Sequence, residues 1–382
     1  MRFHVNRDVF SEAVSFAIKL LPQKTTLPIL SGVLIETTET GLRLSSFDYE
    51  VSAQTDIVAE VEEPGRVLVS GRLLADIAAK LPQAVVTVAT DDNKVLVHAG
   101  SSRFTLLSMP VEEYPTLPKV TSESGLVPGN SFTSAVAQVG VAASRDDVTP
   151  VITGVQLEIH DTSVSMTATD RYRVAIREIE WDNASRSVIE DASALVPART
   201  LIEVGKTFAH AETVGISITQ RDDRELIAFT ANAMTVTSLL IKGNFPPVRR
   251  LFPETLSTYA VVNTADLIEA TRRVSLVLER ESALRFSFTS DSLTLEALGS
   301  ESAQASESID AHLVGDDTVV SLKPQFLLDG LGAVHSEFAR IGFTQTDNPN
   351  KPGPVLITAQ TTQDEVGAQA FKYLLQPNLL LR

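Results

Sequence analysis

The feature that most constrains the fold of this chain is a long internal repeat. The stretch LPILSGVLIE near the N-terminus returns as TPVITGVQLEI, and Gly32 and Gly154 in these stretches lie 154 − 32 = 122 residues apart. The same offset aligns Phe10 with Phe132, and no gap is needed between about residues 10 and 50. A fixed period of this length predicts a chain built from copies of one structural unit.

A third, fainter copy follows the first two. The segment DSLTLEA in the last third of the chain aligns with TGLRLSS in the first third and with TSVSMTA in the second. Later in each copy, a strand-like run leads into a helix-like run, and Asp76, Glu203 and Asp329 occupy the same helical position. We therefore predict three units of about 125 residues. The predicted domains are 1–120, 127–249 and 254–382.

Each unit contains one local pattern twice. A short strand leads into an amphipathic helix, in which Phe10, Val14, Ala17 and Leu21 fall on one face. Three segments of alternating apolar and polar residues follow, separated by turn signals. The chain is therefore predicted to be an α+β protein that repeats βαβββ six times. Its antiparallel sheets would each be covered on one face by helices.

Composition narrows the choice of function. The 382 residues include no cysteine, which excludes disulfides and thiolate metal sites, and 43% are hydrophobic, which is enough for packed cores. No apolar run is long enough to cross a bilayer and no signal peptide is evident, so a cytoplasmic protein is expected. The net charge of −16 argues against binding to nucleic acid unless the cations are concentrated on one surface.

Repeated domains that join head to tail with a constant rotation form a ring when the rotation closes. The stretches TLPILSGVLIE, FDYEVSA, MPVEEYPTLP, TPVITGV, TATDRYRVA, NFPPVRRLFP and YLLQP, spread in order along the chain, carry a resemblance. On these residues the sequence resembles the β subunit family of bacterial DNA polymerase III, the replicative sliding clamps. The resemblance implies three clamp domains per chain and a head-to-tail homodimer that forms a ring around duplex DNA. In such a ring the helices line the hole and the sheets face outward.

The resemblance also implies a non-catalytic protein without a cofactor or metal. It would hold the DNA polymerase III catalytic subunit, the clamp loader, and other polymerases and repair proteins on DNA, and so confer processivity. Sliding needs contacts to phosphates that do not depend on base sequence, which lysine and arginine supply. The predicted DNA-facing residues are Lys19, Lys24, Arg72, Lys80, Arg145, Arg199, Lys206, Arg272, Arg273 and Lys323. The alternative for any one of them is an ordinary solvated helix face.

The family binds short linear peptides of its partners in a hydrophobic cleft between the second and third domains. An aliphatic pocket would bury peptide side chains, while arginines pair with acidic or backbone groups. Matching motifs predicts a pocket formed by Ile152, Thr169, Arg171, Tyr172, Arg173, Val174, Pro246, Arg250, Leu251, Phe326, Val355, Gln376 and Pro377. Core packing is the alternative for Tyr172 and Phe326. The tail departs from the family, which commonly has Met-Pro where this chain has Gln376-Pro377, so its peptide preference stays open.

The ring would close between the first domain of one chain and the third domain of the other. An apolar contact surrounded by ion pairs would allow such a seam to open for loading. The predicted dimer interface consists of Arg103, Phe104, Leu106, Leu276, Glu301 and Glu307. Phe104 and Leu106 alternate as inward residues of a strand do, so packing inside one domain is equally compatible with their pattern.

A different class of function is a β-rich enzyme or a repeat-built ligand-binding protein that does not act on DNA. The six histidines are dispersed without metal-ligand spacing, and no glycine-rich phosphate loop follows a strand. Asp48 and Asp170 recur at matched positions, a pattern that indicates turn capping more than catalysis.

Overall fold

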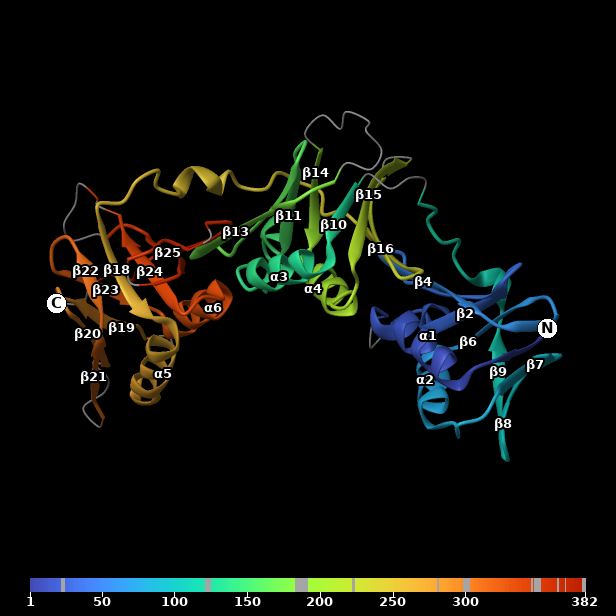
Figure 1. The fold of residues 1–382 in the computed structure, drawn as a ribbon. Helices are drawn as coiled ribbons and strands as arrows, with labels where there is room; N and C mark the ends of the chain where they lie inside the picture. Colours follow the sequence, from blue (N-terminus) through green and yellow to red (C-terminus); the bar gives the residue numbers. More distant parts are fainter. Residues whose placement is uncertain are drawn as a thin grey trace. The chain divides into compact units, whose positions relative to one another are not determined.

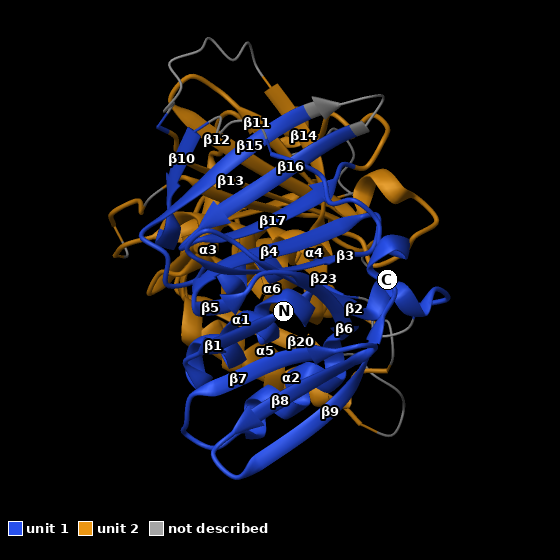
Figure 2. Cartoon of the chain, turned by 90° about the vertical axis from the view of Figure 1, so that its right-hand side faces the viewer, with its two compact units in different colours: residues 1–130, 182–188, 203–240 blue, residues 131–181, 189–202, 241–382 orange. Residues whose placement is uncertain are grey.

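The computed structural model of this chain resolves into two compact units (Figure 2). Unit 1 comprises Met1–Asn130, Asp182–Val188 and Glu203–Leu240, and unit 2 comprises Ser131–Trp181, Ile189–Ile202 and Ile241–Arg382. The residues that the structure describes are 1–21, 25–120, 125–182, 192–221, 224–279, 282–297, 303–344, 346, 352–362, 364–367 and 369–379.

Along the described part of the chain, the order strand, helix and three strands occurs six times (Figure 1), which confirms the predicted βαβββ pattern. The first third contains β1 (Arg2–Val5), α1 (Arg7–Lys19), η1 (Pro28–Ser31), β2 (Gly32–Thr37), β3 (Gly41–Phe47), β4 (Val51–Val58), β5 (Glu60–Glu63), β6 (Arg66–Ser70), α2 (Gly71–Lys80), β7 (Val86–Asp91), β8 (Lys94–Ala99), β9 (Ser102–Met109) and η2 (Val111–Glu113).

The other two thirds repeat this order. The central third contains β10 (Gly125–Pro128), α3 (Gly129–Gly140), η3 (Pro150–Ile152), β11 (Gly154–Ile159), β12 (Ser163–Thr169), β13 (Arg173–Glu180), β14 (Ala192–Pro197), α4 (Ala198–Thr207), β15 (Thr213–Arg221), β16 (Arg224–Ala231) and β17 (Met234–Leu239). The last third contains η4 (Val248–Leu251), β18 (Thr258–Asn263), α5 (Thr264–Val274), η5 (Ser275–Val277), β19 (Leu284–Phe288), β20 (Ser292–Ala297), β21 (Ala305–Asp310), β22 (His312–Val314), β23 (Thr318–Leu322), α6 (Pro324–Val334), β24 (Phe338–Phe343), β25 (Val355–Gln360) and β26 (Phe371–Leu375).

Helix α1 begins at a capping residue and ends earlier than its apolar pattern suggests. Asn6 caps α1 by accepting hydrogen bonds from the backbone N–H groups of Asp8 and Val9, at 2.9 and 3.3 Å. The α1 face buries Phe10, as predicted, but the helix stops at Lys19, so the predicted fourth member of its apolar face, Leu21, lies beyond it. None of the described helices is long and apolar enough to span a bilayer.

Each βαβββ run gives its first strand to the sheet of the neighbouring run. β6 pairs with β2 and β1 pairs with β7, which produces the strand orders β6-β2-β3-β4 and β1-β7-β8-β9. The same exchange produces β14-β11-β12-β13, β10-β15-β16-β17, β23-β19-β20-β21 and β18-β24-β25-β26. All of these pairs are antiparallel. The two runs of one third of the chain are therefore interlocked.

In each unit, one further strand pair joins two of these sheets. In unit 1, β17 pairs with β4 so that Ser238 lies opposite Val51. In unit 2, β26 pairs with β13 so that Leu375 lies opposite Arg173. Val51 and Arg173 are 173 − 51 = 122 residues apart, so the two joins use the same position of the repeat.

The hydrophobic core of the first third lies between its helices and its sheets. Leu42 and Leu44 of β3 and Leu106 of β9 pack in one buried cluster with Phe10 of α1 and Leu74 of α2, and Figure 1 shows α1 and α2 side by side. Alternation along β3 places Arg43 and Ser45 on the opposite face of the sheet.

A buried tyrosine fixes the start of the segment that follows β9. The Tyr114 hydroxyl accepts a hydrogen bond from the backbone N–H of Phe47 at 2.8 Å and donates to the carbonyl of Gly32 at 3.2 Å. Burial raises the pKa of Tyr114 to about 12. Because this value lies above that of an unfolded tyrosine, about 10, the hydroxyl stabilises the fold fully below pH ~10. That contribution is lost as the pH rises through about 12.

We expect Tyr114→Phe to lower the free energy of unfolding by about 1–3 kcal/mol, because it leaves the buried N–H of Phe47 without an acceptor. Urea-induced unfolding at neutral pH measures this loss. The matched control is Tyr49→Phe, since Tyr49 is 46% exposed. Equal stability of the two variants would contradict the prediction.

Candidate functional site

A tight turn between β12 and β13 begins the predicted peptide pocket, which lies within unit 2. The Asp170 carboxylate accepts hydrogen bonds from the backbone N–H groups of Tyr172 and Arg173, at 3.0 and 3.1 Å. Arg171 has a positive φ of 79°, and Tyr49, its counterpart 122 residues earlier, has one of 75°. Asp48 caps the earlier turn in the same way. The predicted turn-capping role of both aspartates is therefore confirmed.

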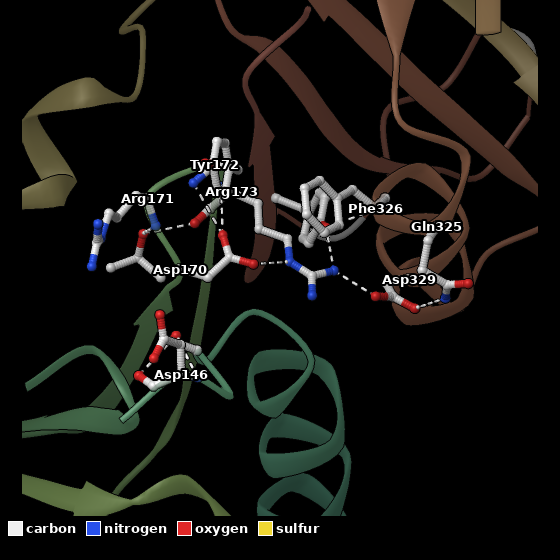
Figure 3. Close-up of polar contacts among 11 residues, drawn as sticks. Asp146, Asp170, Arg171, Tyr172, Arg173, Gln325, Phe326 and Asp329 are labelled. Carbon is white, nitrogen blue, oxygen red and sulfur yellow. Dashed lines mark hydrogen bonds and ion pairs between the residues drawn. The ribbon is translucent and has the colours of Figure 1, made fainter. Parts of the chain in front are cut away.

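Arg173 is the centre of a polar network under this turn (Figure 3). Its guanidinium binds Asp170 at 2.8 Å and Asp329 of α6 at 2.5 Å, and it donates to the Tyr373 hydroxyl at 3.2 Å. Its carbon Cζ lies 4.4 Å from the centre of the Phe326 ring. Arg173 is only 8% exposed. It therefore supports the pocket from below, whereas the exposed Arg171 and Arg250 remain accessible to a ligand.

The titration behaviour of this network follows from its burial. Burial alone would lower the pKa of Arg173, but its interactions with Tyr373 and the hydrogen bond to Asp329 raise it above the usual value. Burial raises the pKa of Tyr373, against the opposing effect of Arg173. The Arg173 guanidinium therefore stays charged at neutral pH, and its contacts to Asp170, Asp329 and Tyr373 make the network a fixed structural element.

Two aromatic side chains form the surface above Arg173. Tyr172 is 57% exposed, and its ring stacks on that of Phe326 with 6.0 Å between centroids. The Lys323 ammonium lies 5.8 and 5.6 Å from these two ring centroids. Lys323 therefore lies beside this aromatic surface, and its assignment to the DNA-facing set stays a prediction. Phe326 is held in place because its carbonyl accepts a hydrogen bond from the Tyr373 hydroxyl at 2.8 Å.

An apolar cluster continues the site on the face where η4 crosses the sheet. Val174 and Leu374 pack with Val248 and Leu356. Val355 was predicted to line the pocket, but it is fully buried, and alternation along β25 puts it on the face of the sheet opposite Leu356. Leu356 is therefore the residue of β25 that packs in this apolar cluster. Of the other predicted residues, Ile152 and Thr169 are buried, Pro246 is half-buried, and Leu251 is 51% exposed.

The C-terminal segment is fastened to the turn. The backbone N–H of Gln376 donates to the Tyr172 carbonyl at 2.8 Å, and that of Asn378 donates to the Ser321 carbonyl at 2.8 Å. Pro377 is buried and the Gln376 side chain is exposed. The residue at which this chain departs from the family pattern thus presents its side chain next to the exposed Tyr172.

The predicted DNA-facing cations other than Lys323 differ in the contacts they make. Lys24 lies outside the described residues. Lys19, at the end of α1, donates to the Thr207 hydroxyl at 2.9 Å. The cations that are exposed and form no ion pair within the described part of the chain are Arg72, Lys80, Arg145 and Arg199.

The remaining predicted cations each pair with a carboxylate on the protein surface. The pairs are Lys206–Glu203 at 2.7 Å, Arg272–Glu269 at 2.7 Å and Arg273–Glu307 at 2.6 Å. The hydrogen bond from Arg273 lowers the pKa of Glu307. Arg273 and Glu307 were predicted to serve DNA and the dimer interface separately, and the structure brings them together.

The residues predicted for the dimer interface differ in accessibility. Leu276 in η5 is 83% exposed and Phe104 is 37% exposed, whereas Leu106 is only 3% exposed and packs in the core. Leu106 is therefore corrected to a core residue, and the exposed leucine of β9 is Leu107, at 68%. Arg103 is exposed, and its guanidinium approaches the His98 ring at 3.2 Å. Glu301 lies outside the described residues.

The described residues contain six βαβββ runs, with sheets joined edge to edge by β17–β4 in unit 1 and by β26–β13 in unit 2, and this arrangement defines a clamp fold. Comparison with known families gives the same result. Three family models match: the N-terminal domain of the DNA polymerase III beta subunit at residues 1–118, its central domain at 126–247 and its C-terminal domain at 249–363. The chain therefore belongs to the DNA polymerase III beta subunit family.

Individual relatives agree with this assignment. The beta sliding clamp of Streptomyces coelicolor is 44% identical over 378 residues, covering 99% of both chains. The beta sliding clamp of Micrococcus luteus is 48% identical over 314 residues, which are 82% of this chain and all of the relative. Among solved structures, the beta subunit of DNA polymerase from Streptococcus pyogenes superimposes with a TM-score of 0.89 at 26% identity, covering all of both chains.

Proposed function

We propose that this chain is a non-catalytic sliding clamp, two copies of which close head to tail around duplex DNA. The ring holds the DNA polymerase III catalytic subunit, the clamp loader, and other polymerases and repair proteins on DNA through their short linear motifs. Membership in the beta subunit family supports the clamp role. The observation that best supports the ring is the repeated join between sheets. The described part of the chain makes this join twice and leaves two equivalent strand edges, which could form a third join, unpaired.

The open halves are strand edges. Each existing join pairs the last strand of one run with the last strand of another: β4 with β17, and β13 with β26. The corresponding last strands in the other two runs are β9 and β21. Within the described residues, β21 pairs only with β20, and β9 pairs with β6 only at Ser108 and Met109. Exposed edges are templates for pairing with another chain.

The repeat also predicts a register for the third join. The hairpins β8-β9 and β16-β17 close at the pairs Ala99↔Ser102 and Ala231↔Met234, so Phe104 corresponds to Val236. The pair Ala297↔Ala305 corresponds to Ser46↔Ala53. Because Val236 lies opposite Ala53, we expect Phe104 to lie opposite the partner's Ala305.

This register makes a sharp experiment possible, because the chain has no cysteine of its own. It places Arg103 opposite the partner's Ser306. In a protein carrying Arg103→Cys and Ser306→Cys, oxidation is expected to join two chains through two disulfides. When this protein is loaded onto nicked circular DNA by a clamp loader and then oxidised, it should resist a high-salt wash. Cutting the circle should release it.

The matched control moves one cysteine by a single residue. Arg103→Cys with Glu307→Cys should cross-link poorly, because a one-residue shift turns the side chain to the other face of the sheet. Equal cross-linking of both pairs would contradict the register. Oxidised protein that remains bound after the circle is cut would contradict encirclement.

The unpaired cations support DNA binding by phosphate neutralisation. In Arg72→Gln and Arg199→Gln, the slope of log affinity for a short duplex against log salt is expected to flatten by about 0.9 for each phosphate that the protein no longer neutralises. Fluorescence anisotropy titrations at several salt concentrations measure the slope.

Carboxylates that pair with cations provide a control of opposite sign. Glu269→Gln releases Arg272 from its ion pair, so affinity for the same duplex should rise and the slope should steepen. A fall in affinity in Glu269→Gln, or an unchanged slope in the arginine variants, would show that these cations are solvated helix faces.

A further inference from the structure

A cavity of about 590 Å³ lies in unit 1, on the sheet face opposite the hydrophobic core. Its floor is formed by β2, β3, β4 and β17, which run side by side (Figure 2). Its wall is the segment 111–120, which Tyr114 and Leu117 hold against Leu34. The cavity shares no residue with the peptide pocket of unit 2.

The floor is polar. Strand register aligns Ser45, Gln54 and Thr235 in one row and Ser52 and Thr237 in the next. Within the described part of the chain, none of these five side chains has a hydrogen-bond partner, and none of their polar atoms is among those sealed from solvent. Gln54 and Thr235 are half-buried, whereas Ser45, Ser52 and Thr237 are only 1%, 4% and 3% exposed. A ligand in the cavity therefore meets mainly the Gln54 amide and the Thr235 hydroxyl, groups that suit the alternating donors and acceptors of a peptide main chain.

The edge of the cavity carries charges of both signs. The Arg43 guanidinium forms an ion pair with the Asp56 carboxylate through two hydrogen bonds of 2.7 and 2.8 Å. Glu36 lies opposite Arg43 on one side and opposite Arg66 on the other. Arg66 and Lys119 are exposed and form no ion pair within the described residues. These two cations are available to a carboxylate of a ligand.

At the equivalent join in unit 2, the space that corresponds to this cavity is filled by side chains. The offset of 122 relates Ser52 to Val174, and the common register of the two joins relates Thr237 to Leu374. In unit 2, Val174 and Leu374 pack with Val248 of the crossing segment and fill the space. At the same place in unit 1, small polar side chains leave it open.

We propose that this cavity binds an extended acidic peptide segment of a partner protein. The main chain of the segment hydrogen-bonds to the hydroxyl and amide floor, and one of its carboxylates binds Arg66 and Lys119. The site accepts a polar segment, whereas the pocket of unit 2 accepts apolar anchors. It does not depend on closure of the ring.

The probe is a phage library of random twelve-residue peptides, selected on the full-length protein with an excess of polymerase peptide blocking the pocket of unit 2. Acidic sequences are expected to be enriched. Their dissociation constants should rise about tenfold in Ser52→Val/Thr237→Leu, which fills the cavity with the side chains of its repeat counterpart. In Arg66→Gln/Lys119→Gln, binding should weaken about threefold or more and lose its salt dependence.

Thr230→Val is the matched control, because Thr230 lies opposite Thr235 on the same sheet but does not line the cavity. Its affinity should equal that of the unmodified protein. A selection without acidic enrichment, or peptides that bind the filled variant equally well, would overturn the proposal.

A second measurement does not require the filled variant to fold. In Gln54→Cys, the new thiol is the only one in the chain, and a selected peptide should slow its alkylation by iodoacetamide about tenfold at saturation. Unchanged alkylation in the presence of peptide would place the binding elsewhere and overturn the proposal.

Discussion

Replacing Arg173 with methionine is expected to lower the free energy of unfolding by about 3 kcal/mol, because Asp170 and Asp329 would be left facing each other without their cation. Phe326 would also lose the guanidinium that lies against its ring, and the aromatic surface with Tyr172 would lose its support. Binding of a fluorescent peptide from the polymerase III catalytic subunit should therefore weaken about tenfold or more. Urea unfolding and fluorescence anisotropy measure the two effects.

Arg171→Met is the matched control, since Arg171 is exposed and its guanidinium contacts only the Thr149 hydroxyl among the described residues. It should unfold like the unmodified protein. Asp329→Asn should fall between the two, because a neutral amide keeps a hydrogen-bonding oxygen for Arg173 and removes the charge. If Arg173→Met resisted urea as well as Arg171→Met did, and bound peptide as well as the unmodified protein, the network would not support the pocket.

Replacing Leu276 with aspartate is expected to convert the protein to monomers at micromolar concentration. Leu276 is 83% exposed in the single chain, and burying a leucine at the seam stabilises it by about 1.5–3 kcal/mol. Aspartate removes this contribution and adds the cost of burying a charge, so the dimer dissociation constant should rise about a hundredfold. Sedimentation velocity measures the assembly, and primer extension with a clamp loader should lose processivity.

Val148→Asp provides the comparison, because Val148 is 81% exposed and belongs to neither the predicted seam nor the pocket. It should remain a dimer. Leu276→Asp should also keep its affinity for the polymerase peptide, which Arg173→Met loses. A dimeric Leu276→Asp protein would place the seam elsewhere.

The repeated architecture could be predicted because each copy of the unit has the same local sequence pattern. The 122-residue offset relates Gly32 to Gly154, which begin equivalent strands. It also relates Tyr49 to Arg171, which both have a positive φ in equivalent turns. The exchange of first strands could not be predicted, because alternation of apolar and polar residues reports which face a strand buries but not which neighbour it chooses.

The site was predicted less completely, for a related reason. Motifs predicted Tyr172, Arg173 and Phe326 as pocket residues. The sequence did not indicate that the Arg173 guanidinium binds Asp170, Asp329 and Tyr373 of the same chain. The sequence singled out its partner Asp329 only because an acidic residue recurs at the same helical position in each unit. That recurrence did not indicate which residue Asp329 contacts. Lys323 resembles the other helix-terminal cations in the sequence, and its position beside the stacked rings of Tyr172 and Phe326 could not be predicted.

Because β1 and β6 are exchanged, the two βαβββ runs of the first third cannot each fold alone, and the same holds for the other two thirds. A fragment that ended after β4 would keep β1 without β7, and β2 without β6. It would have to recruit those strands from another molecule, so it should swap or aggregate instead of folding alone. Insertions and fusions are therefore better tolerated at the hairpin tips, such as the Gly100 turn, than between the two runs of one third.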